Sequence, residues 1–389
     1  MDDALLDIKD KPARQQPEWG DASKVRQVAD TLARRPALVD AREVDSLRAL
    51  LARVASGEAL VVQSGDCAED PAECTPGYVA RKTAVLDLLA GALKMITHKP
   101  VIRVGRIAGQ FGKPRSSPTE LVGGVQLPSY RGHMVNGPEP DPESRRPEPG
   151  RILACYWAAG EIMNHLGWRD TWRRAVEPPV WTSHEALILD YELPMVRRDE
   201  QGRLLLTSTH WPWIGERTRQ LDGAHVALLS RVVNPVACKI GPTVTTDELL
   251  ALCERLDPDR EKGRLTLIAR MGASKVAERL PKLVAAAREA GHPVIWLTDA
   301  MHGNTVSLPG GIKTRFLETI EQEIQEFQEA VRSEGGITGG LHLETTPDDV
   351  TECVPNDTCV DHVADKYTSY CDPRLNPSQA VAVASAWLG

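Results

Sequence analysis

Short apolar runs of strand length alternate with helix-like segments along most of this chain, and this alternation constrains the fold more than any other feature. Helical patterns lie between most of the runs, and strands that alternate with helices form parallel βαβ units. Eight units in one chain favour a closed (β/α)8 barrel, the TIM-barrel form of the α/β class, over an open sheet. The expected strands are Ala59–Gln63, the run from Val101, Val180–Ser183, His210–Ile214, Val236–Ile240, Thr266–Arg270, Val294–Leu297 and Gly340–Leu343.

The segment before the first expected strand has a helical pattern. Val44, Leu47, Leu50, Leu51 and Val54 recur at helical spacing. We therefore divide the chain into a short N-terminal helical extension, residues 1–57, and a (β/α)8 barrel, residues 58–389. Within the barrel, Ser129–Gly150 is rich in Pro, Glu and Arg, and we expect a long surface loop there.

Charge and cysteine content narrow the possible partners. The chain carries 46 Lys and Arg against 54 Asp and Glu, a net charge of −8. An acidic chain with local basic clusters favours small anionic ligands over nucleic acid. No apolar run approaches the ~18 residues that a membrane helix needs. Eight scattered cysteines and an acidic N-terminus without an apolar signal region favour a cytoplasmic protein.

The basic stretch 103–116, RVGRIAGQFGKPRS, follows the second expected strand and has the composition of an anion site. Its cations are separated by Ile107, Ala108 and Phe111, so they do not form one continuous solvated face. Guanidinium, ammonium and hydroxyl groups on a loop shaped by Gly and Pro are donors suited to phosphate and carboxylate. The alternative is a solvated basic loop. Its polar members are Arg103, Arg106, Lys113, Arg115 and Ser116.

Charged residues also stand at the carboxyl ends of the other expected strands, where the active sites of barrel enzymes lie. Arg217, Lys239 and Arg270 are further cations of this kind, and the last two end apolar strands. A cation in such a strand is either paired or directed at a ligand. The alternative to a ligand site is a set of buried ion pairs with Asp66, Glu185 and Glu216.

Four other strand-end and loop residues have the chemistry of a divalent metal site. A thiolate, an imidazole and two carboxylates suit Mn²⁺, Co²⁺ or Fe²⁺ better than an all-cysteine zinc site would. The four lie too far apart in the sequence to be called a site on that ground, and each taken alone is more often structural. They are Cys67, His302, Glu344 and Asp372.

Taken together, these stretches resemble the type II 3-deoxy-D-arabino-heptulosonate-7-phosphate (DAHP) synthases. The similar motifs run in family order from about residue 55 to about residue 385, and as a set they are highly specific. They read QSGDCAE (63–69), RVGRIAGQFGKPRS (103–116), RGHMVNG (131–137), SHEALILDYE (183–192), WIGERTRQLDGAHV (213–226), NPVACKIGPT (234–243), RMGA (270–273), DAMHGNT (299–305), GGLHLETTPDDVTEC (339–353) and CDPRLNPSQA (371–380).

The resemblance implies an enzyme that joins phosphoenolpyruvate (PEP) to erythrose 4-phosphate in the first step of the shikimate pathway. It places a divalent metal, Mn²⁺ or Co²⁺, on Cys67, His302, Glu344 and Asp372. It places PEP on Arg106, Glu216 (through its backbone N–H), Arg217, Lys239 and Arg270. Erythrose 4-phosphate would be bound by Lys113, Arg115 and Ser116.

The implied mechanism assigns further roles. The metal would act as a Lewis acid on the aldehyde oxygen while C3 of PEP attacks the aldehyde carbon. Lys239, Glu344 and Lys113 are the expected catalytic groups, handling protons and charge. Trp213 would form a wall of the PEP pocket, or else belong to the barrel core. Cys371 adjoins Asp372, so oxidation could join it to Cys67 in a disulfide.

The chain departs from the family pattern at three places. Ala300 stands where Pro is usual, Pro347 where Gly is more usual, and Phe111-Gly112 where Tyr-Ala is common. None of them removes an expected ligand. The chain is also shorter than the long members whose extra segments carry aromatic-amino-acid regulation. It resembles the short subgroup tied to secondary pathways such as phenazine formation, so we expect weak feedback inhibition.

Three alternatives remain at this point. An amino-DAHP synthase would use an imino sugar phosphate on the same scaffold. Another metal-dependent barrel lyase or hydrolase could act on phosphorylated acids without PEP. A non-catalytic regulatory barrel is disfavoured by the intact motifs. In each case we expect a homo-oligomer, either a dimer or a tetramer.

Overall fold

Eight parallel strands close into a barrel in the computed structural model, which describes residues 3–170, 172 and 176–389. Their order around the barrel is β1-β14-β11-β10-β9-β8-β5-β2. All eight coincide with expected strands to within a few residues, which confirms the fold class. Their bounds are β1 (Leu60–Gly65), β2 (Val101–Arg106), β5 (Trp181–Glu185), β8 (Trp211–Ile214), β9 (Val236–Ile240), β10 (Leu265–Ala269), β11 (Ile295–Thr298) and β14 (Ile337–Glu344).

The chain divides into two compact units. Unit 1 consists of Met1–Asp45, Ala68–Val79 and Ile107–Asn234, and it contributes β5 and β8 to the barrel. Unit 2 consists of Ser46–Cys67, Ala80–Arg106 and Pro235–Gly389, and it contributes the other six strands. Two helices, α2 (Ala41–Ala55) and α3 (Pro76–Thr97), have residues in both units.

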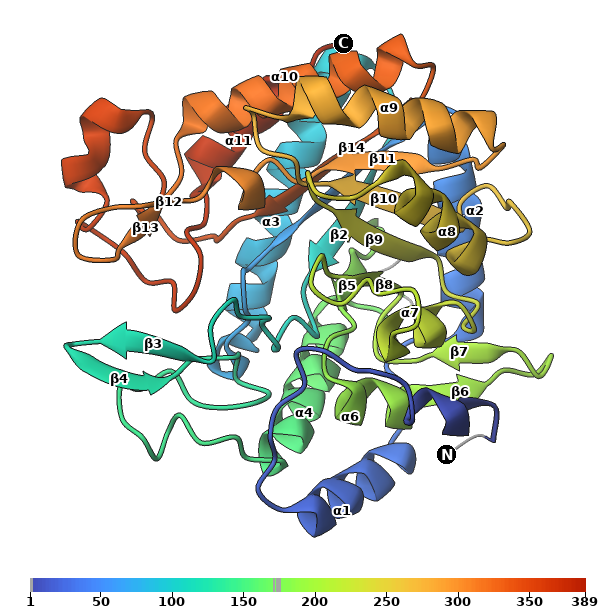
Figure 1. The fold of residues 1–389 in the computed structure, drawn as a ribbon, viewed down its shortest axis with the longest axis vertical. Helices are drawn as coiled ribbons and strands as arrows, with labels where there is room; N and C mark the ends of the chain where they lie inside the picture. The colour runs from blue at the N-terminus through green and yellow to red at the C-terminus, as the bar shows by residue number, and fades with distance from the viewer. Residues whose placement is uncertain (1–2, 171, 173–175) are drawn as a thin grey trace. The chain divides into compact units, whose positions relative to one another are not determined.

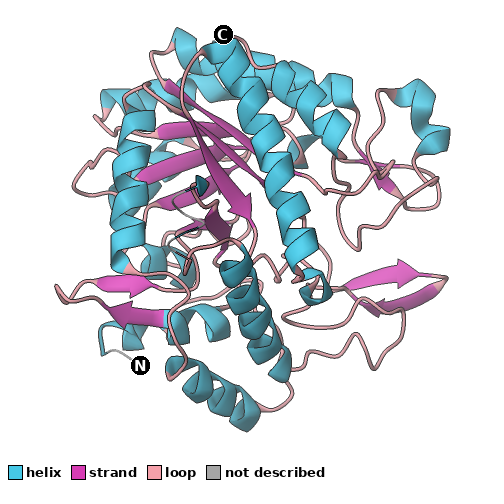
Figure 2. Cartoon of the chain, turned by 180° about the vertical axis from the view of Figure 1, so that it is seen from behind, coloured by secondary structure: helices cyan, strands magenta, loops and turns pink. Residues whose placement is uncertain are grey.

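Unit 1 is built from helices of different lengths and two antiparallel hairpins, which Figure 2 shows as small pairs of strands. Asp21 begins its first long helix by accepting hydrogen bonds from the N–H groups of Ser23 and Lys24. Residues 129–149 form the expected long loop, and a helix starts at Gly150. The expected surface position is wrong for the first part of the loop, because Tyr130, Met134 and Val135 are buried. The elements are η1 (Asp3–Ile8), α1 (Ala22–Ala33), η2 (Pro71–Glu73), β3 (Thr119–Val122), β4 (Val125–Pro128), α4 (Gly150–His165), α6 (Leu189–Glu192), η3 (Leu193–Met195), β6 (Val196–Arg198), β7 (Leu204–Leu206) and α7 (Ala224–Leu229).

Unit 2 places its longer helices beside the barrel strands, with α9 next to both α8 and α10 (Figure 1). β1, β9, β10 and β11 are buried along their whole length, as expected of parallel strands covered on both faces. The elements are α8 (Thr246–Leu256), α9 (Val276–Glu289), η4 (His302–Asn304), β12 (Val306–Ser307), β13 (Lys313–Thr314), α10 (Leu317–Ser333), η5 (Asp357–His362) and α11 (Pro377–Ser385).

Two helices of unit 2 follow directly from their sequence pattern. Thr245 and Glu248 form a reciprocal capping box at the start of α8. In α10 the apolar stripe Ile320, Ile324, Phe327 is fully buried, so this helix is fixed by packing on the barrel. Within the part of the chain that the structure describes, no helix combines the length and apolar character needed to cross a bilayer.

Candidate active site

The carboxyl ends of β1 and β14 bring the expected metal-binding residues of unit 2 together. Cys67 follows β1, Glu344 ends β14, and Asp372 lies in the loop before α11; one ligand atom from each falls within 4.8 Å of the others. His302 begins η4, and its Nε2 lies 3.3 Å from Glu344 Oε1. The backbone N–H of Asp372 donates to Cys67 Sγ at 3.3 Å. Three of the four expected ligands, which span 305 positions of sequence, therefore lie together, and His302 adjoins them through its contact with Glu344.

The ring of His302 is oriented by a carboxylate that the sequence analysis did not assign. Asp299 Oδ2 lies 2.8 Å from His302 Nδ1. This contact leaves Nε2 directed at Glu344, which is the arrangement of a carboxylate-supported histidine ligand. Burial lowers the pKa of His302, against the opposing effect of Asp299 and Glu344. The lowered pKa favours the neutral imidazole, the form that binds a metal.

The cations expected at the strand ends of unit 2 lie around these same groups. Arg106 Nη2 donates to Glu344 Oε1 at 3.1 Å, and Arg270 Nη2 donates to the carbonyl of His302 at 3.3 Å. Lys239 Nζ lies 2.7 Å from Asp299 Oδ2. Burial lowers the pKa of Lys239, while Asp299 opposes that shift. Arg106 and Arg270 thus bond Glu344 and His302 directly, and Lys239 is linked to His302 through Asp299.

Arg315 is a further buried cation at Glu344, and no local pattern in the sequence marked it. Its Nη1 donates to Glu344 Oε2 at 2.8 Å, and its Nε donates to Thr305 Oγ1 at 2.9 Å. Since Arg106 bonds the other carboxylate oxygen, the plane of the Glu344 carboxylate is fixed from two sides. Such support fixes the direction in which a carboxylate can offer its lone pairs to a metal.

A buried charge network supports the backbone at the thiol and at the second carboxylate. Arg374 donates to Asp66 Oδ1 at 2.9 Å and to Glu352 Oε1 at 2.8 Å. Asp66 also pairs with Lys82 at 2.7 Å. Burial would raise the pKa of Asp66, but Lys82 and Arg374 outweigh it and lower the pKa. Because Asp66 precedes Cys67 and Arg374 follows Asp372 by two residues, the network holds both segments in place.

The residues expected to bind erythrose 4-phosphate lie in unit 1, on the loop that follows Arg106. Lys113 is buried, and its backbone N–H donates to the Arg131 carbonyl at 2.8 Å. Arg115 is ion-paired with Glu120. Ser116 Oγ accepts a hydrogen bond from Arg217 Nη2 at 2.7 Å. This unit therefore joins one of the expected PEP residues, Arg217, to one of the expected sugar-phosphate residues.

Three further residues complete the account of unit 1. Trp213 is buried on β8. Glu216 Oε1 lies 3.0 Å from Arg219 Nη2, so its side chain has a structural partner and its expected role rests on the backbone N–H. Arg131 was not assigned from the sequence; burial and the neighbouring Arg115 lower its pKa. Its carbonyl accepts the N–H of Lys113, so Arg131 lies beside the loop that carries Lys113.

A buried carboxylate shapes the start of this loop. Glu69 accepts the N–H groups of Ala108, Gly109 and Gln110 at 3.1, 2.8 and 2.8 Å. Ala108 has a positive φ of 65°, which a non-glycine residue rarely adopts. The three hydrogen bonds stabilise this conformation and fix the direction in which the loop leaves β2.

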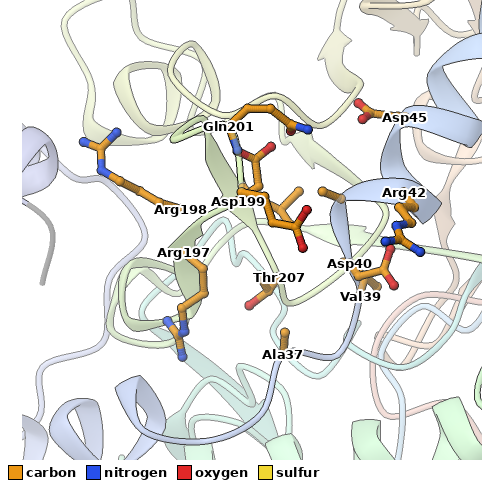
Figure 3. Close-up of a pocket in the computed structure, with 13 residues that line it drawn as sticks. Ala37, Val39, Asp40, Arg42, Asp45, Arg197, Arg198, Asp199, Gln201 and Thr207 are labelled. Carbon is orange, nitrogen blue, oxygen red and sulfur yellow. The ribbon is translucent and has the colours of Figure 1, made fainter.

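A separate cavity of about 420 Å³ lies within unit 1, between the segment Ala37–Asp45 and the β6–β7 hairpin (Figure 3). None of its lining residues is an expected site residue. Asp45 and Asp199, which line it, both bond Arg203, at 2.8 and 2.7 Å. A single guanidinium therefore bridges these two carboxylates within unit 1.

Comparisons with known proteins cover nearly the whole chain. The sequence profile of the Class-II DAHP synthetase family matches residues 4–177 and 167–387. The chain belongs to this family. It is 57% identical over 389 residues to a "Probable phospho-2-dehydro-3-deoxyheptonate aldolase" of Pseudomonas fluorescens, covering 100% of this chain and 97% of that protein.

Two more distant relatives of this class-II chain carry the same kind of name. A phospho-2-dehydro-3-deoxyheptonate aldolase of Streptomyces coelicolor is 41% identical over 425 positions, covering 97% of this chain and 94% of that protein. A relative of that description from Mycolicibacterium smegmatis is 37% identical over 438 positions, covering 99% and 93%. The family resemblance stated from the motifs is confirmed by these matches.

Proposed function

We propose that this class-II DAHP synthase condenses PEP with erythrose 4-phosphate and water to give DAHP and inorganic phosphate. In this reaction C3 of PEP forms a bond to the aldehyde carbon, water adds at C2, and phosphate leaves by C–O cleavage. The observation that carries the proposal is the convergence of Cys67, Glu344 and Asp372 within 4.8 Å in a chain that matches the family from end to end.

Class-II DAHP synthases depend on a metal, and the donor set found here fits one. Cys67, His302, Glu344 and Asp372 would hold the ion, and Mn²⁺ or Co²⁺ suits a set of one sulfur, one nitrogen and two carboxylates. When bound, the ion would supply Lewis-acid polarisation of the aldehyde oxygen. Supporting this, Asp299, Arg315 and Arg106 already orient the imidazole and one carboxylate.

The cations of each unit supply the remaining binding groups. For PEP we propose the residues that the family motifs imply, which are Arg106, Glu216 (through its backbone N–H), Arg217, Lys239, Arg270 and Trp213. For erythrose 4-phosphate we propose Lys113, Arg115 and Ser116. Guanidinium groups match carboxylate and phosphate oxygens in pairs, which holds the reacting carbons in a productive orientation.

Lys239 is the proposed proton donor, with Glu344 and Lys113 as the other catalytic groups. A lysine whose pKa is lowered by burial releases a proton more readily than an exposed one. Asp299, 2.7 Å away, would hold the ammonium in one position before transfer. Lys113 is buried on its loop, where its charge is weakly screened by water.

The subgroup, the domain division, the cellular location and the oligomeric state are also proposals. The alignments to the Streptomyces and Mycolicibacterium relatives run over 425 and 438 positions, more than the 389 residues of this chain, so those relatives carry segments that this chain lacks. This supports the short subgroup that feeds secondary pathways such as phenazine formation. We also propose the division at residues 57 and 58, a cytoplasmic location and a homo-oligomeric state.

The test is an assay of the purified chain after chelation and after restoration of Mn²⁺. We expect phosphate release from PEP only when erythrose 4-phosphate and the metal are both present. Erythrose 4-phosphate supplies the aldehyde carbon that C3 of PEP attacks, and the metal would polarise the aldehyde oxygen. Periodate-detected DAHP should equal the PEP consumed. Full activity in excess chelator would remove the metal from the proposal, and turnover with an imino sugar phosphate alone would assign the amino-DAHP reaction instead.

A further inference from the structure

Two loops of unit 2 that carry expected site residues touch each other through their backbones. The loop after β10 carries Arg270, and η4 carries His302. A Cβ on Gly303 would lie 2.4 Å from the backbone nitrogen of Gly272, so only glycine permits this approach. Arg270 Nη2 also donates to the His302 carbonyl at 3.3 Å. The positions of the proposed PEP residue and of the proposed metal ligand are therefore interdependent.

A carboxylate from α10 is bonded to both loops. Glu323 is completely buried. Its Oε1 accepts the N–H groups of Met271 and Gly272 at 3.2 and 2.9 Å, and its Oε2 accepts Asn304 Nδ2 at 2.6 Å. Asn304 Oδ1 in turn accepts the N–H of Ala273 at 3.1 Å. One side chain thus ties residues 271 and 272 to residue 304.

A glutamate at this position is costly for the fold. Burial raises the pKa of Glu323 to about 7, and the nearby charge of Asp299 adds to this, although the bonds from Gly272 and Asn304 oppose it. A buried carboxylate is stabilising only when its hydrogen bonds are made, and an apolar side chain would serve packing as well. Packing of α10 does not require a carboxylate at this position. The three hydrogen-bond donors that face Glu323 do, so we infer that its role is to hold them.

We propose that Glu323 is a positioning residue that fixes the loop of Arg270 relative to the loop of His302. It would thereby set the distance between the bound PEP and the bound metal. The inference rests on the proposed function and adds to it a residue outside the substrate and metal contacts. Its hydrogen bonds reach the loops of Arg270 and His302, whereas Lys113, Arg115 and Ser116 sit on another segment. Loss of Glu323 should therefore affect PEP and metal binding more than binding of erythrose 4-phosphate.

The test is Glu323→Gln, which keeps the size of the side chain but turns an NH₂ group toward a donor. Only one of the two loops can then keep its bond. Loss of a supporting partner of this kind typically costs about 10- to 100-fold. We expect KM for PEP and the Kd for Mn²⁺ each to rise about tenfold, with KM for erythrose 4-phosphate within about twofold of the original. Calorimetric titration of the metal-free protein gives the Mn²⁺ value without turnover.

Two controls separate positioning from general destabilisation. Glu329→Gln changes an exposed glutamate of the same helix and should alter nothing. Val331→Ala opens a buried site eight residues along α10, about 12 Å away by helix rise, and should lower Tm without changing the Mn²⁺ Kd. If Glu323→Gln does not fold, Asn304→Ala cuts the same link from its other end and should raise the Mn²⁺ Kd in the same direction.

The outcomes separate the positioning role of Glu323 from the proposed function of the enzyme. Unchanged KM for PEP and unchanged Mn²⁺ Kd in Glu323→Gln would overturn the inference, as would equal shifts in Val331→Ala. An unmodified chain that binds Mn²⁺ but forms no DAHP would instead overturn the proposed function. In that case, a weakened Mn²⁺ affinity in Glu323→Gln would still establish that the residue positions His302.

Discussion

Asp299 serves two partners at once, and its charge explains how both are held. One oxygen lies 2.7 Å from Lys239 Nζ and 2.8 Å from His302 Nδ1. Burial would raise its pKa, but His302 and Lys239 lower it well below the ordinary value. The carboxylate therefore stays ionised across the working pH range and can orient both side chains. The Ala300 that follows, where relatives of the family usually have Pro, leaves this arrangement intact.

Glu323 has the opposite balance, and its titration gives a prediction for stability. Its pKa is raised from 4.5 to about 7 in the folded chain, chiefly by burial. Folding therefore takes up a proton between these values, so the contribution of Glu323 favours the fold at acid pH and declines as pH rises. We expect the unfolding free energy of the wild type, relative to Glu323→Gln, to fall by about 3 kcal/mol between pH 4.5 and 7.5.

Denaturant unfolding of both proteins across this pH range would measure the difference. The other titrating groups are common to both proteins, so their effects cancel in the difference between the two unfolding free energies. Because Gln does not titrate, the remaining pH dependence reports on Glu323. Glu329→Gln, at an exposed position of the same helix, is the matched control for replacing a glutamate by glutamine. A constant difference between wild type and Glu323→Gln would show that the carboxylate keeps the same protonation in folded and unfolded chains.

The start of α8 offers a prediction about a single helix. Thr245 Oγ1 accepts the N–H of Glu248 at 3.2 Å, and Glu248 Oε2 accepts the N–H of Thr245 at 3.0 Å. Thr245→Ala removes one half of this cap and should lower the unfolding free energy by about 1 kcal/mol. Thr246→Ala, one residue later on the exposed surface, is the matched control for loss of a threonine side chain. Equal effects of the two changes in urea unfolding would contradict the cap as the cause.

Elements with a strong local pattern were predictable from the sequence, and those fixed by distant partners were not. All eight barrel strands were expected from their short apolar runs, and the α8 cap and the α10 stripe follow the same kind of local pattern. The β3–β4 hairpin was missed, although Gly123-Gly124 between two short strands is a hairpin signal and both residues have positive φ. The β6–β7 strands have three residues each, too few for a recognisable alternation.

The expected metal ligands of the site were predictable from the sequence, whereas most of the residues that support them were not. Cys67, His302, Glu344 and Asp372 were named through family motifs, since no spacing in the sequence relates them. Their supporting partners were missed because each contact joins segments far apart, as between Arg374 and Asp66, which are 308 residues apart. Asp299 is the exception: an Asp three residues before a His in a strand-end motif could have been recognised as its orienting group.

The size of the whole chain bears on its regulation. The two relatives aligned over 425 and 438 positions contain segments that have no counterpart here. If such segments carry the inhibitor sites, this enzyme should keep most of its activity in millimolar Trp, Phe or Tyr, added singly or together. Initial rates at PEP concentrations near KM would measure this, and a long relative assayed in parallel would be the control. Strong inhibition of this chain would contradict the proposed subgroup.

The bond pattern of Glu69 limits how the molecule can capture phosphate. In P-loop enzymes, consecutive backbone amides form a concave nest that the ligand's oxygens fill. Here the amides of residues 108–110 already enclose the protein's own carboxylate. These three amides are therefore not available to a ligand, and we expect selectivity among phosphorylated metabolites to come from the side-chain cations together with the Glu216 N–H. Affinity should then follow the number and reach of arginines and lysines, which substitution can tune one charge at a time.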